Sequence, residues 1–361
     1  MKPKKEKYHC MGLMSGTSLD GVDVVLCEFA NSNGQWEYRL IGGKTVHYTD
    51  SWKELLARSY TMKAAELVEL DHNYGKYLGA ICQDFLSENG GDPSFIASHG
   101  HTVFHRPDLG YSLQIGNGHD LAAVTEKPVI YDFRSRDISL GGQGAPLVPA
   151  GDRLLFGDFE SCLNIGGFTN ISYNNADGER IAFDICPANT VLNHLSSRLG
   201  QGYDHNGASG RKGKIIPGLL SALNDLPFYL LPPPKSTGRE FLEKDIMPLL
   251  AARDENPEDL LRTFYEHIIT QVNRVLGGRE AGRILVTGGG ARNTYLMELL
   301  RKQNAHEIVI PGEALIDFKE AIVFAFLGLL RMLGENNCLS SVTGASSDNS
   351  GGIIIWPGRE N

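Results

Sequence analysis

The segment MGLMSGTSLDG, residues 11–21, links two apolar runs through a short turn rich in serine, threonine and glycine. The runs on either side, YHCMGLM and VDVVLCEF, predict two strands joined by this turn. Such a turn fits a tight hairpin, a serine nucleophile or a cradle for phosphate. Because the segment lacks the G-x-S-x-G pattern of a hydrolase nucleophile, and because hydroxyls and glycine amides suit phosphate, the cradle explains it best.

The pattern around this turn occurs twice along the chain. A third strand, WEYRLIGGKTVHY, is followed by helical segments and by the short strands SFIASHG, YSLQIG and PVIYDF. From Ser161 the order returns as SCLNIGG, FTNISYNN and RIAFDI, then the helix PEDLLRTFYEHIITQVNRVLG, the strand GRILVTGGG and the helices NTYLMELLRKQ and EAIVFAFLGLLRML. This repeat predicts a duplicated α/β unit with two lobes, residues 1–150 and 151–361, and a cleft between them.

The composition is that of a folded globular protein. The chain has 361 residues, of which 42% are apolar and 21% charged. Its net charge of −9 argues against nucleic acid or an anionic membrane as the main partner. No apolar run reaches the roughly 20 residues that span a bilayer, and the start MKPKKEK lacks the apolar stretch of a secretory signal. Six cysteines without a C-x-x-C pair predict reduced thiols in a cytoplasmic protein.

Three glycine turns, MSGTSLDG, NIGGFTN and VTGGGARN, each follow a predicted apolar strand. A single such turn is better explained by a hairpin, but together the three predict a nucleotide clamped in the cleft. We expect Asp20 to hold Mg²⁺, with Asp23 as a further oxygen ligand nearby, because magnesium prefers oxygen. The predicted nucleotide-binding residues are Ser15, Gly16, Thr17, Ser18, Asp20, Gly21, Asp23, Asn164, Gly166, Gly167, Gly288, Gly289 and Gly290.

In this order the turns resemble the phosphate-1, phosphate-2 and adenosine motifs of the actin, hexokinase and Hsp70 fold. The chain as a whole resembles the anhydro-N-acetylmuramic acid kinases, in stretches that extend from residue 11 to about residue 345. These stretches are GLMSGTSLDGVD, SHGHTVFHRP, QIGNGHDLA, DFRSRDISLGGQGAPLVP, NIGGFTNIS, FDICPAN, GYDHNGA, PPKSTGRE, TGGGARN and EAIVFAFLG.

The resemblance implies a duplicated ribonuclease H-like, actin-like ATPase fold with two lobes and a central cleft for nucleotide and sugar. It also implies ATP and Mg²⁺ as cofactors and a homodimer. The implied reaction opens the 1,6-anhydro bridge of 1,6-anhydro-N-acetylmuramic acid with water and phosphorylates O6. This yields N-acetylmuramic acid 6-phosphate and ADP in peptidoglycan recycling. Met14 and Asn164 stand where the wider superfamily often has Asp, so magnesium handling is expected to differ in detail.

Two carboxylates are candidates for the chemistry. Asp184 ends an apolar strand, where it either caps a helix starting near Pro187 or, as the resemblance implies, acts as the general base. Cys186 stands where the family usually has Gly. Glu320 opens a predicted helix, where it either complements the helix dipole or, by resemblance, helps to hold the attacking water.

Further polar residues are candidates for the sugar. Arg134 offers a planar fork for the lactyl carboxylate of muramic acid, with a surface salt bridge as the alternative. Asn117 and His119, followed by Asp120, lie at a strand end and either bind sugar hydroxyls or serve as loop and cap residues.

Other functions remain open at this point. His99, His101 and His105 are spaced so that a metal-dependent hydrolase is the runner-up of another class. A plain sugar kinase, in which Asp184 deprotonates a sugar hydroxyl, and a nucleotide-switched assembly protein of the actin type are further alternatives. In the stretch KSTGREF, residues 235–241, either an N-capped helix start or anion-binding cations explain the pattern.

Overall fold

The structure is a computed structural model and describes residues 7–16, 18–32, 34–251 and 255–358. The described residues up to Leu155 and from Phe318 onward form one compact unit, unit 1, and those within Phe156–Asp317 form another, unit 2. The first boundary lies close to the expected one at residue 150. The expected second lobe, residues 151–361, needs correction, because the chain from Phe318 onward packs into unit 1.

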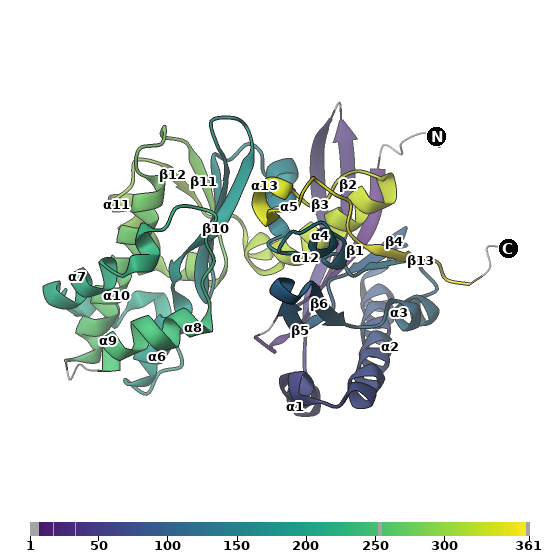
Figure 1. The fold of residues 1–361 in the computed structure, drawn as a ribbon, viewed down its shortest axis with the longest axis horizontal. Coiled ribbons are helices and arrows are strands. Elements are labelled where there is room, and N and C mark those ends of the chain that lie inside the picture. Colours follow the sequence, from purple (N-terminus) through teal and green to yellow (C-terminus); the bar gives the residue numbers. More distant parts are fainter. Residues whose placement is uncertain (1–6, 17, 33, 252–254, 359–361) are drawn as a thin grey trace. The chain divides into compact units, whose positions relative to one another are not determined.

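Unit 1 is built on a mixed sheet in the order β13-β7-β4-β1-β2-β3 (Figure 1). β1 pairs antiparallel with β2, which pairs antiparallel with β3, whereas β4 runs parallel to β1 and β7 parallel to β4. The strands are β1 (Lys7–Ser15), β2 (Gly21–Ser32), β3 (Gln35–His47), β4 (Phe95–Ser98), β7 (Val129–Tyr131) and β13 (Ile353–Ile355), with β5 (His101–Arg106) paired to β6 (Tyr111–Ile115) beside them.

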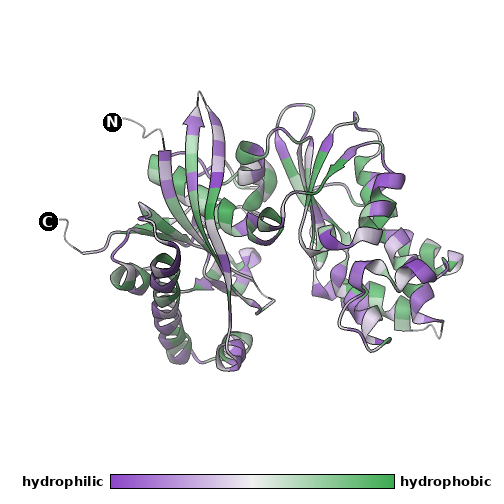
Figure 2. Cartoon of the chain, turned by 180° about the vertical axis from the view of Figure 1, so that it is seen from behind, coloured by the Kyte–Doolittle hydropathy of each residue, from purple (hydrophilic) through white to green (hydrophobic). Residues whose placement is uncertain are grey.

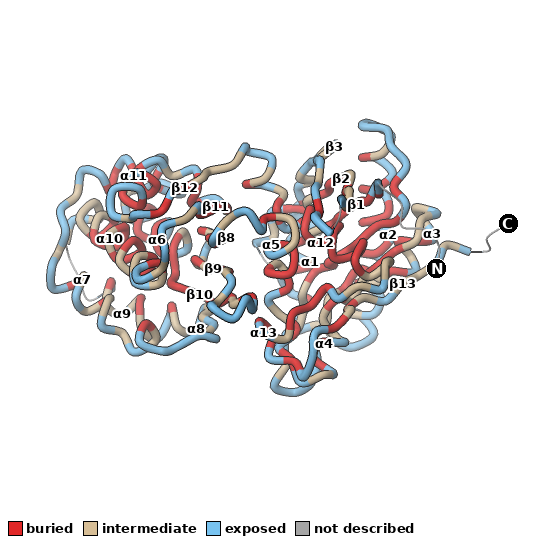
Figure 3. The backbone as a smooth tube through the Cα atoms, turned by 90° about the horizontal axis from the view of Figure 1, so that it is seen from above, coloured by how far each residue is buried: buried red, intermediate tan, exposed pale blue. Residues whose placement is uncertain are grey.

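Helix α12 (Glu313–Leu333) explains why the C-terminal part of the chain joins unit 1. Its stretch AIVFAF, residues 321–326, is buried, as Figure 3 shows by the red tube at this helix. A Cβ atom at Gly12 would lie 2.2 Å from the carbonyl oxygen of Ala321, so only glycine lets β1 and α12 approach this closely. The other helices of unit 1 are α1 (Asp50–Arg58), α2 (Ala64–Asn89), α3 (Gly118–Thr125), α4 (Ser135–Ser139), α5 (Val148–Leu155) and α13 (Ser340–Thr343).

Unit 2 repeats the strand order of unit 1. Its sheet runs β10-β9-β8-β11-β12, with three antiparallel strands followed by two parallel ones. The strands are β8 (Ser161–Ile165), β9 (Phe168–Asn174), β10 (Arg180–Pro187), β11 (Arg283–Thr287) and β12 (Glu307–Val309). In unit 1 the corresponding order is β3-β2-β1-β4-β7. The predicted duplicated α/β unit of ribonuclease H-like order is therefore confirmed.

The core of unit 2 gathers around α10 (Pro257–Leu276), whose apolar residues Leu260, Phe264 and Ile268 are fully buried. Figure 2 shows how apolar colour runs through the strands and the inner faces of the helices. The remaining helices are α6 (Asn189–Ser197), α7 (Pro217–Asn224), α8 (Arg239–Phe241), α9 (Met247–Ala251) and α11 (Thr294–Lys302). In the described part of the chain, none of the helices has the length and apolarity to cross a membrane.

Candidate active site

Asp184 lies in β10, directly before a bulge that separates it from Cys186. One of its oxygens, Oδ2, accepts hydrogen bonds from the Thr237 amide at 2.9 Å and from the Ser236 hydroxyl at 3.1 Å. The Asp184 amide in turn donates to the carbonyl of Lys235 at 3.1 Å. Within the described residues no donor reaches the other oxygen, Oδ1. The carboxylate is thus fixed through one oxygen while the other is left for a ligand.

The alternative role of Asp184 as a helix cap is wrong. The next helix, α6, begins at Asn189, and its N-cap residue is Ala188. Burial raises the pKa of Asp184, and the hydrogen bonds from Thr237 and Ser236 only partly offset this. A half-buried carboxylate with a raised pKa and one open oxygen has the properties of a general base.

The second and third glycine turns lie next to each other in unit 2. Gly288 has a φ of +80°, and a Cβ atom there would lie 2.6 Å from Asn164 Oδ1 and 2.7 Å from the Ile165 carbonyl oxygen. The amides of Ala188 and Asn189 donate to the carbonyls of the turn after β8, at 2.8 and 3.1 Å. The predicted residues of these two turns are therefore brought together: Asn164, Gly166, Gly167, Gly288, Gly289 and Gly290.

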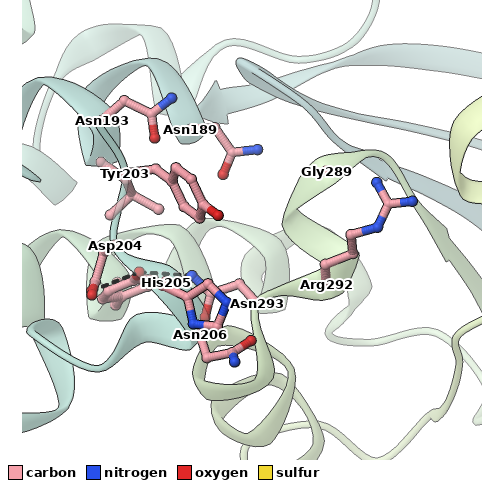
Figure 4. A pocket seen from close by; sticks show the side chains of 11 residues that line it. Asn189, Asn193, Tyr203, Asp204, His205, Asn206, Gly289, Arg292 and Asn293 are labelled. Atoms are coloured by element: carbon pink, nitrogen blue, oxygen red, sulfur yellow. Dashed lines mark hydrogen bonds between the residues drawn. The ribbon is translucent and has the colours of Figure 1, made fainter. Parts of the chain in front are cut away.

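A pocket of about 350 Å³ opens beside the third turn of unit 2. Figure 4 shows polar side chains converging on it from α6, from residues 203–206 and from the turn after β11. It is lined by Asn189, Leu192, Asn193, Tyr203, Asp204, His205, Asn206, Tyr265, Gly289, Arg292 and Asn293. Its aromatic and aliphatic side chains suit the planar ring of a nucleotide base, and its side-chain amides supply hydrogen-bond donors and acceptors.

Buried hydrogen bonds fix the wall of this pocket. Asp204 accepts from the amides of Ser209 and Gly210 and, at 3.1 Å, from the Tyr265 hydroxyl. The Asn293 side-chain amide donates to the same hydroxyl at 2.7 Å. Except for Gly289, the sequence prediction did not include the residues that line the pocket. The signal for several of them was present in the stretches GYDHNGA and TGGGARN.

The first turn, in unit 1, begins with a serine whose side chain is buried. The Ser15 hydroxyl is buried, 2.7 Å from the Tyr48 hydroxyl and 3.2 Å from Nδ1 of His101, and the Tyr48 and Tyr74 hydroxyls are 2.5 Å apart. This hydroxyl is therefore buried among side chains of unit 1, and its expected contact with phosphate stays a prediction.

The other predicted residues of the first turn differ in their exposure and contacts. Ser18 and Asp20 are exposed and Gly16 is half-buried, while Thr17 lies outside the described residues. A Cβ atom at Gly21 would lie 2.4 Å from a β3 carbonyl oxygen, so this glycine serves the pairing of β2 with β3. Asp23 accepts a hydrogen bond from the Thr45 hydroxyl at 2.6 Å.

The described residues contain no group of three or more His, Cys, Asp or Glu that could hold a metal ion. Because Mg²⁺ typically keeps several waters and uses only one or two carboxylates together with substrate phosphates, such a group is not needed. The exposed Asp20 carboxylate fits a site of this kind.

Arg134 is held from two sides in unit 1. Its guanidinium donates to the Gly144 carbonyl at 2.7 Å and to Nε2 of His99 at 2.7 Å. The other ring nitrogen of His99 is 2.9 Å from the Gly100 carbonyl oxygen, so this imidazole is neutral with its proton on Nδ1. Within the described residues the buried Nε of Arg134 has no hydrogen-bond partner. Arg134 is thus half-buried with donor capacity to spare, which does not fit the surface salt-bridge alternative.

Glu320 lies well inside α12 rather than at its start, since the helix begins at Glu313. The helix-dipole alternative is therefore wrong, because that effect is confined to the first turn. Glu320 retains accessible surface, but crowding by protein raises its pKa, while Lys319 and Arg134 act in the opposite direction. Lys319 itself forms a buried ion pair of 2.8 Å with Asp152.

The predicted sugar residues at the start of α3 are used as loop and cap residues. The Asn117 side chain accepts from the His119 amide at 3.1 Å, which caps the helix, and donates to Asp71 at 3.0 Å. Asp120 binds Nδ1 of His72 at 2.5 Å, and His119 is exposed. The capping interpretation of Asn117 is confirmed, and the contact of Asn117 and His119 with sugar stays a prediction.

The spacing of three histidines does not produce a metal site. β4 ends at Ser98, and Gly100, with a φ of +71°, separates it from β5 at His101, so His99 and His101 are not neighbours on one strand. His99 uses both ring nitrogens in hydrogen bonds, His101 contacts Ser15, and the ring of the exposed His105 contacts Ser112. This arrangement does not support the metal-dependent hydrolase.

The stretch KSTGREF does not form the expected capped helix start. The N-cap residue of α8 is Gly238, whereas Ser236 and Thr237 hold Asp184 instead. Lys235 donates to the carbonyl of Phe228 at 3.2 Å and lies over its ring.

Comparison with known proteins agrees with the motifs. The family model described as anhydro-N-acetylmuramic acid kinase matches residues 8–357. Proteins named anhydro-N-acetylmuramic acid kinase from Aliivibrio fischeri and Shewanella oneidensis are each 38% identical to this chain, covering 97% and 95% of it and 99% and 97% of the relatives. The relative of that name from Nitrosospira multiformis is 35% identical over 97% of the chain and 99% of its own length.

Among solved structures, an activator of a 2-hydroxyisocaproyl-CoA dehydratase from Clostridium difficile is more distantly similar. It has a TM-score of 0.44 and 13% identity, over 90% of this chain and 97% of that one. The family assignment rests instead on the near-complete match to the family model and on relatives with more than 30% identity. By these criteria the chain belongs to the anhydro-N-acetylmuramic acid kinase family.

Proposed function

We propose that this chain uses ATP to phosphorylate O6 of 1,6-anhydro-N-acetylmuramic acid while water opens the 1,6-anhydro bridge. The products are N-acetylmuramic acid 6-phosphate and ADP, and the substrate indicates peptidoglycan recycling. Family membership supports the kinase class and the substrate. The observation that carries the hydrolytic step is Asp184, whose carboxylate is anchored through Oδ2 and open at Oδ1.

Asp184 is the proposed general base. The Thr237 amide and the Ser236 hydroxyl hold the carboxylate in one orientation, so that Oδ1 can take a proton from a water molecule. As the water oxygen bonds to C1 of the sugar, the C1–O6 bond breaks and O6 receives the phosphoryl group. A positioned base of this kind contributes about 10²–10⁴-fold to the rate.

The pocket of unit 2 is the proposed nucleoside site. Tyr203 and Leu192 offer surfaces for a base, and Asn293 is held in place through Tyr265. When bound, ATP supplies the phosphoryl group that makes O6 a leaving group. The amides of the glycine turns are proposed to contact phosphate. Asp20 is proposed to hold Mg²⁺, which would offset phosphate charge.

Unit 1 supplies the proposed sugar-binding residues. The spare donors of Arg134 suit the lactyl carboxylate, because a guanidinium pairs with a carboxylate through two parallel hydrogen bonds. Glu320 is proposed to hold the attacking water, and Asn117 and His119 to contact sugar hydroxyls. The six buried thiols and the family support a cytoplasmic protein, and the family suggests a homodimer.

The direct test is ADP release from ATP and Mg²⁺ with and without 1,6-anhydro-N-acetylmuramic acid. We expect release only with the anhydro sugar. Release without any sugar would favour a nucleotide-switched assembly protein, and equal release with N-acetylmuramic acid would favour a plain sugar kinase.

A further inference from the structure

Asp137, in α4 of unit 1, is a fully buried carboxylate that is not part of the proposed chemistry. Its Oδ2 accepts from the Gly144 amide at 2.8 Å. Its Oδ1 accepts from the Thr343 hydroxyl at 2.9 Å, the Asn349 side-chain amide at 2.9 Å and the Cys338 thiol at 3.0 Å. Four donors thus converge on one side chain, as a buried carboxylate requires.

The fit around this carboxylate is close. A Cβ atom at Gly142 would lie 2.2 Å from Asp137 Oδ2, so glycine at this position leaves room for the carboxylate. Three of the four donors come from residues 338–349, about 200 positions later in the sequence. Backbone hydrogen bonds from Gln143 to Thr343 and from Ser346 to Leu140 hold the same two segments together.

The contacts continue from Asp137 to Arg134. The Gly144 residue that donates its amide to Asp137 also offers its carbonyl to the Arg134 guanidinium at 2.7 Å. A Cβ atom at Gly144 would lie 3.3 Å from the Arg134 Cβ atom, so this backbone lies against the arginine. Gly144 therefore links the Asp137 carboxylate to the Arg134 guanidinium through its amide on one side and its carbonyl on the other.

We propose that Asp137, held by Cys338, Thr343 and Asn349, is a positioning residue that orients Arg134 toward the carboxylate of the sugar substrate. The proposal rests on the proposed function, in which Arg134 binds that carboxylate. It gives the C-terminal segment, residues 338–349, a part in substrate recognition although none of its side chains needs to touch the sugar.

The test is the Michaelis constant of each substrate in Asp137→Asn and in the milder Thr343→Val. Asparagine at position 137 places an NH₂ group among donors that need an acceptor. Valine at position 343 removes the hydroxyl that donates to Asp137 but keeps the shape of threonine. We expect the KM for the anhydro sugar to rise about tenfold in Asp137→Asn and about threefold in Thr343→Val, with the KM for ATP unchanged. If Asp137→Asn does not fold, Thr343→Val carries the test.

A matched control is Thr263→Val, which removes a buried threonine hydroxyl in unit 2 that accepts from the Ile216 amide. It should leave the KM for the sugar unchanged. In an Arg134→Gln background, Asp137→Asn and Thr343→Val should add no further rise, because their effect passes through Arg134.

Two results would overturn the proposal and can be told apart. If Arg134→Gln raises the KM for the sugar but the Asp137 and Thr343 variants do not, or if their effects add to it, the positioning role is wrong while the Arg134 assignment stands. If Arg134→Gln itself leaves that KM unchanged, the assignment of Arg134 fails, and the role of Asp137 fails with it.

Discussion

Asp184 in unit 2 and Glu320 in unit 1 are both carboxyl groups whose pKa is raised by the protein around them, but they are held in different ways. Neutral donors, the Thr237 amide and the Ser236 hydroxyl, hold Asp184. Around Glu320 the influences are charges, with Lys319 and Arg134 lowering its pKa and Asp23 and Asp152 raising it. Hydrogen bonds fix the direction in which the Asp184 carboxylate points, whereas the nearby charges set the electrostatic potential at Glu320. Asp184 is therefore suited to a directional proton transfer and Glu320 to a supporting role.

The largest effect is expected from Asp184→Asn. The variant should fold and bind ATP as the wild type does, since asparagine keeps an oxygen acceptor for Thr237 and Ser236. Because it removes the base, kcat should fall by about 10²–10⁴-fold. Steady-state kinetics and calorimetric titration with ATP measure the two quantities. A kcat close to that of the wild type would remove Asp184 from the mechanism.

The next largest effect is expected from Arg134→Gln. Loss of a charged donor to the sugar carboxylate costs about 1.5–3 kcal/mol, or about 10–150-fold in the KM for the anhydro sugar. The matched control is Arg136→Gln, because Arg136 lies two residues further along, in α4, and is exposed. If both variants raise this KM equally, the effect is one of overall charge and Arg134 has no special role.

Glu320→Gln should lower kcat by about tenfold, since it weakens the interaction with the attacking water by roughly the free energy of one hydrogen bond. The comparison with Asp184 predicts a further difference. Loss of kcat through Glu320 should depend on ionic strength, because charges surround this group, while the effect of Asp184→Asn should not. Measurements of kcat for the wild type and both variants at low and high salt test this difference. The same salt dependence in both variants would contradict the distinction between Glu320 and Asp184.

The smallest effect is expected from Ser236→Ala. A hydrogen bond to the ionised carboxylate lowers its pKa, so its removal should raise the pKa of Asp184 further. Activity needs the ionised base, and the acidic limb of the pH profile of kcat/KM should therefore move to higher pH by about half a unit to one unit. The control is Ser221→Ala, which removes a serine hydrogen bond of 2.9 Å to the carboxylate of Asp225. An unshifted limb in Ser236→Ala would mean that Ser236 does not act on the base.

The succession of three strands at the start of each half was predictable because local sequence patterns specify it. Glycine turns between apolar runs predicted three strands in each half. The structure confirms them, because β2 pairs with β1 and β3, and β9 pairs with β8 and β10. The place of α12 was not predictable in this way. Its pattern indicated a helix, but not the sheet on which the helix packs, which depends on the missing side chain at Gly12.

The site was predictable only where one segment carries it. Asp184 stood out at a strand end, but its anchors lie about 50 residues later, in a stretch whose composition suggested a helix cap. Likewise, the sequence indicated the glycine turns but not Tyr203 or Asn293, because a pocket wall is assembled from distant segments. The surroundings of Ser15 were not predictable either, since nothing local indicates that Tyr48 and His101 contact its hydroxyl.

The measurement that tests the proposed reaction most directly is the mass of the product formed from 1,6-anhydro-N-acetylmuramic acid and ATP with Mg²⁺ in ¹⁸O-labelled water. We predict a product heavier than the sugar by one phosphoryl group and one labelled water, with the label at C1. Phosphate gained without labelled water would contradict the coupled opening of the ring and the role of Asp184 in activating water.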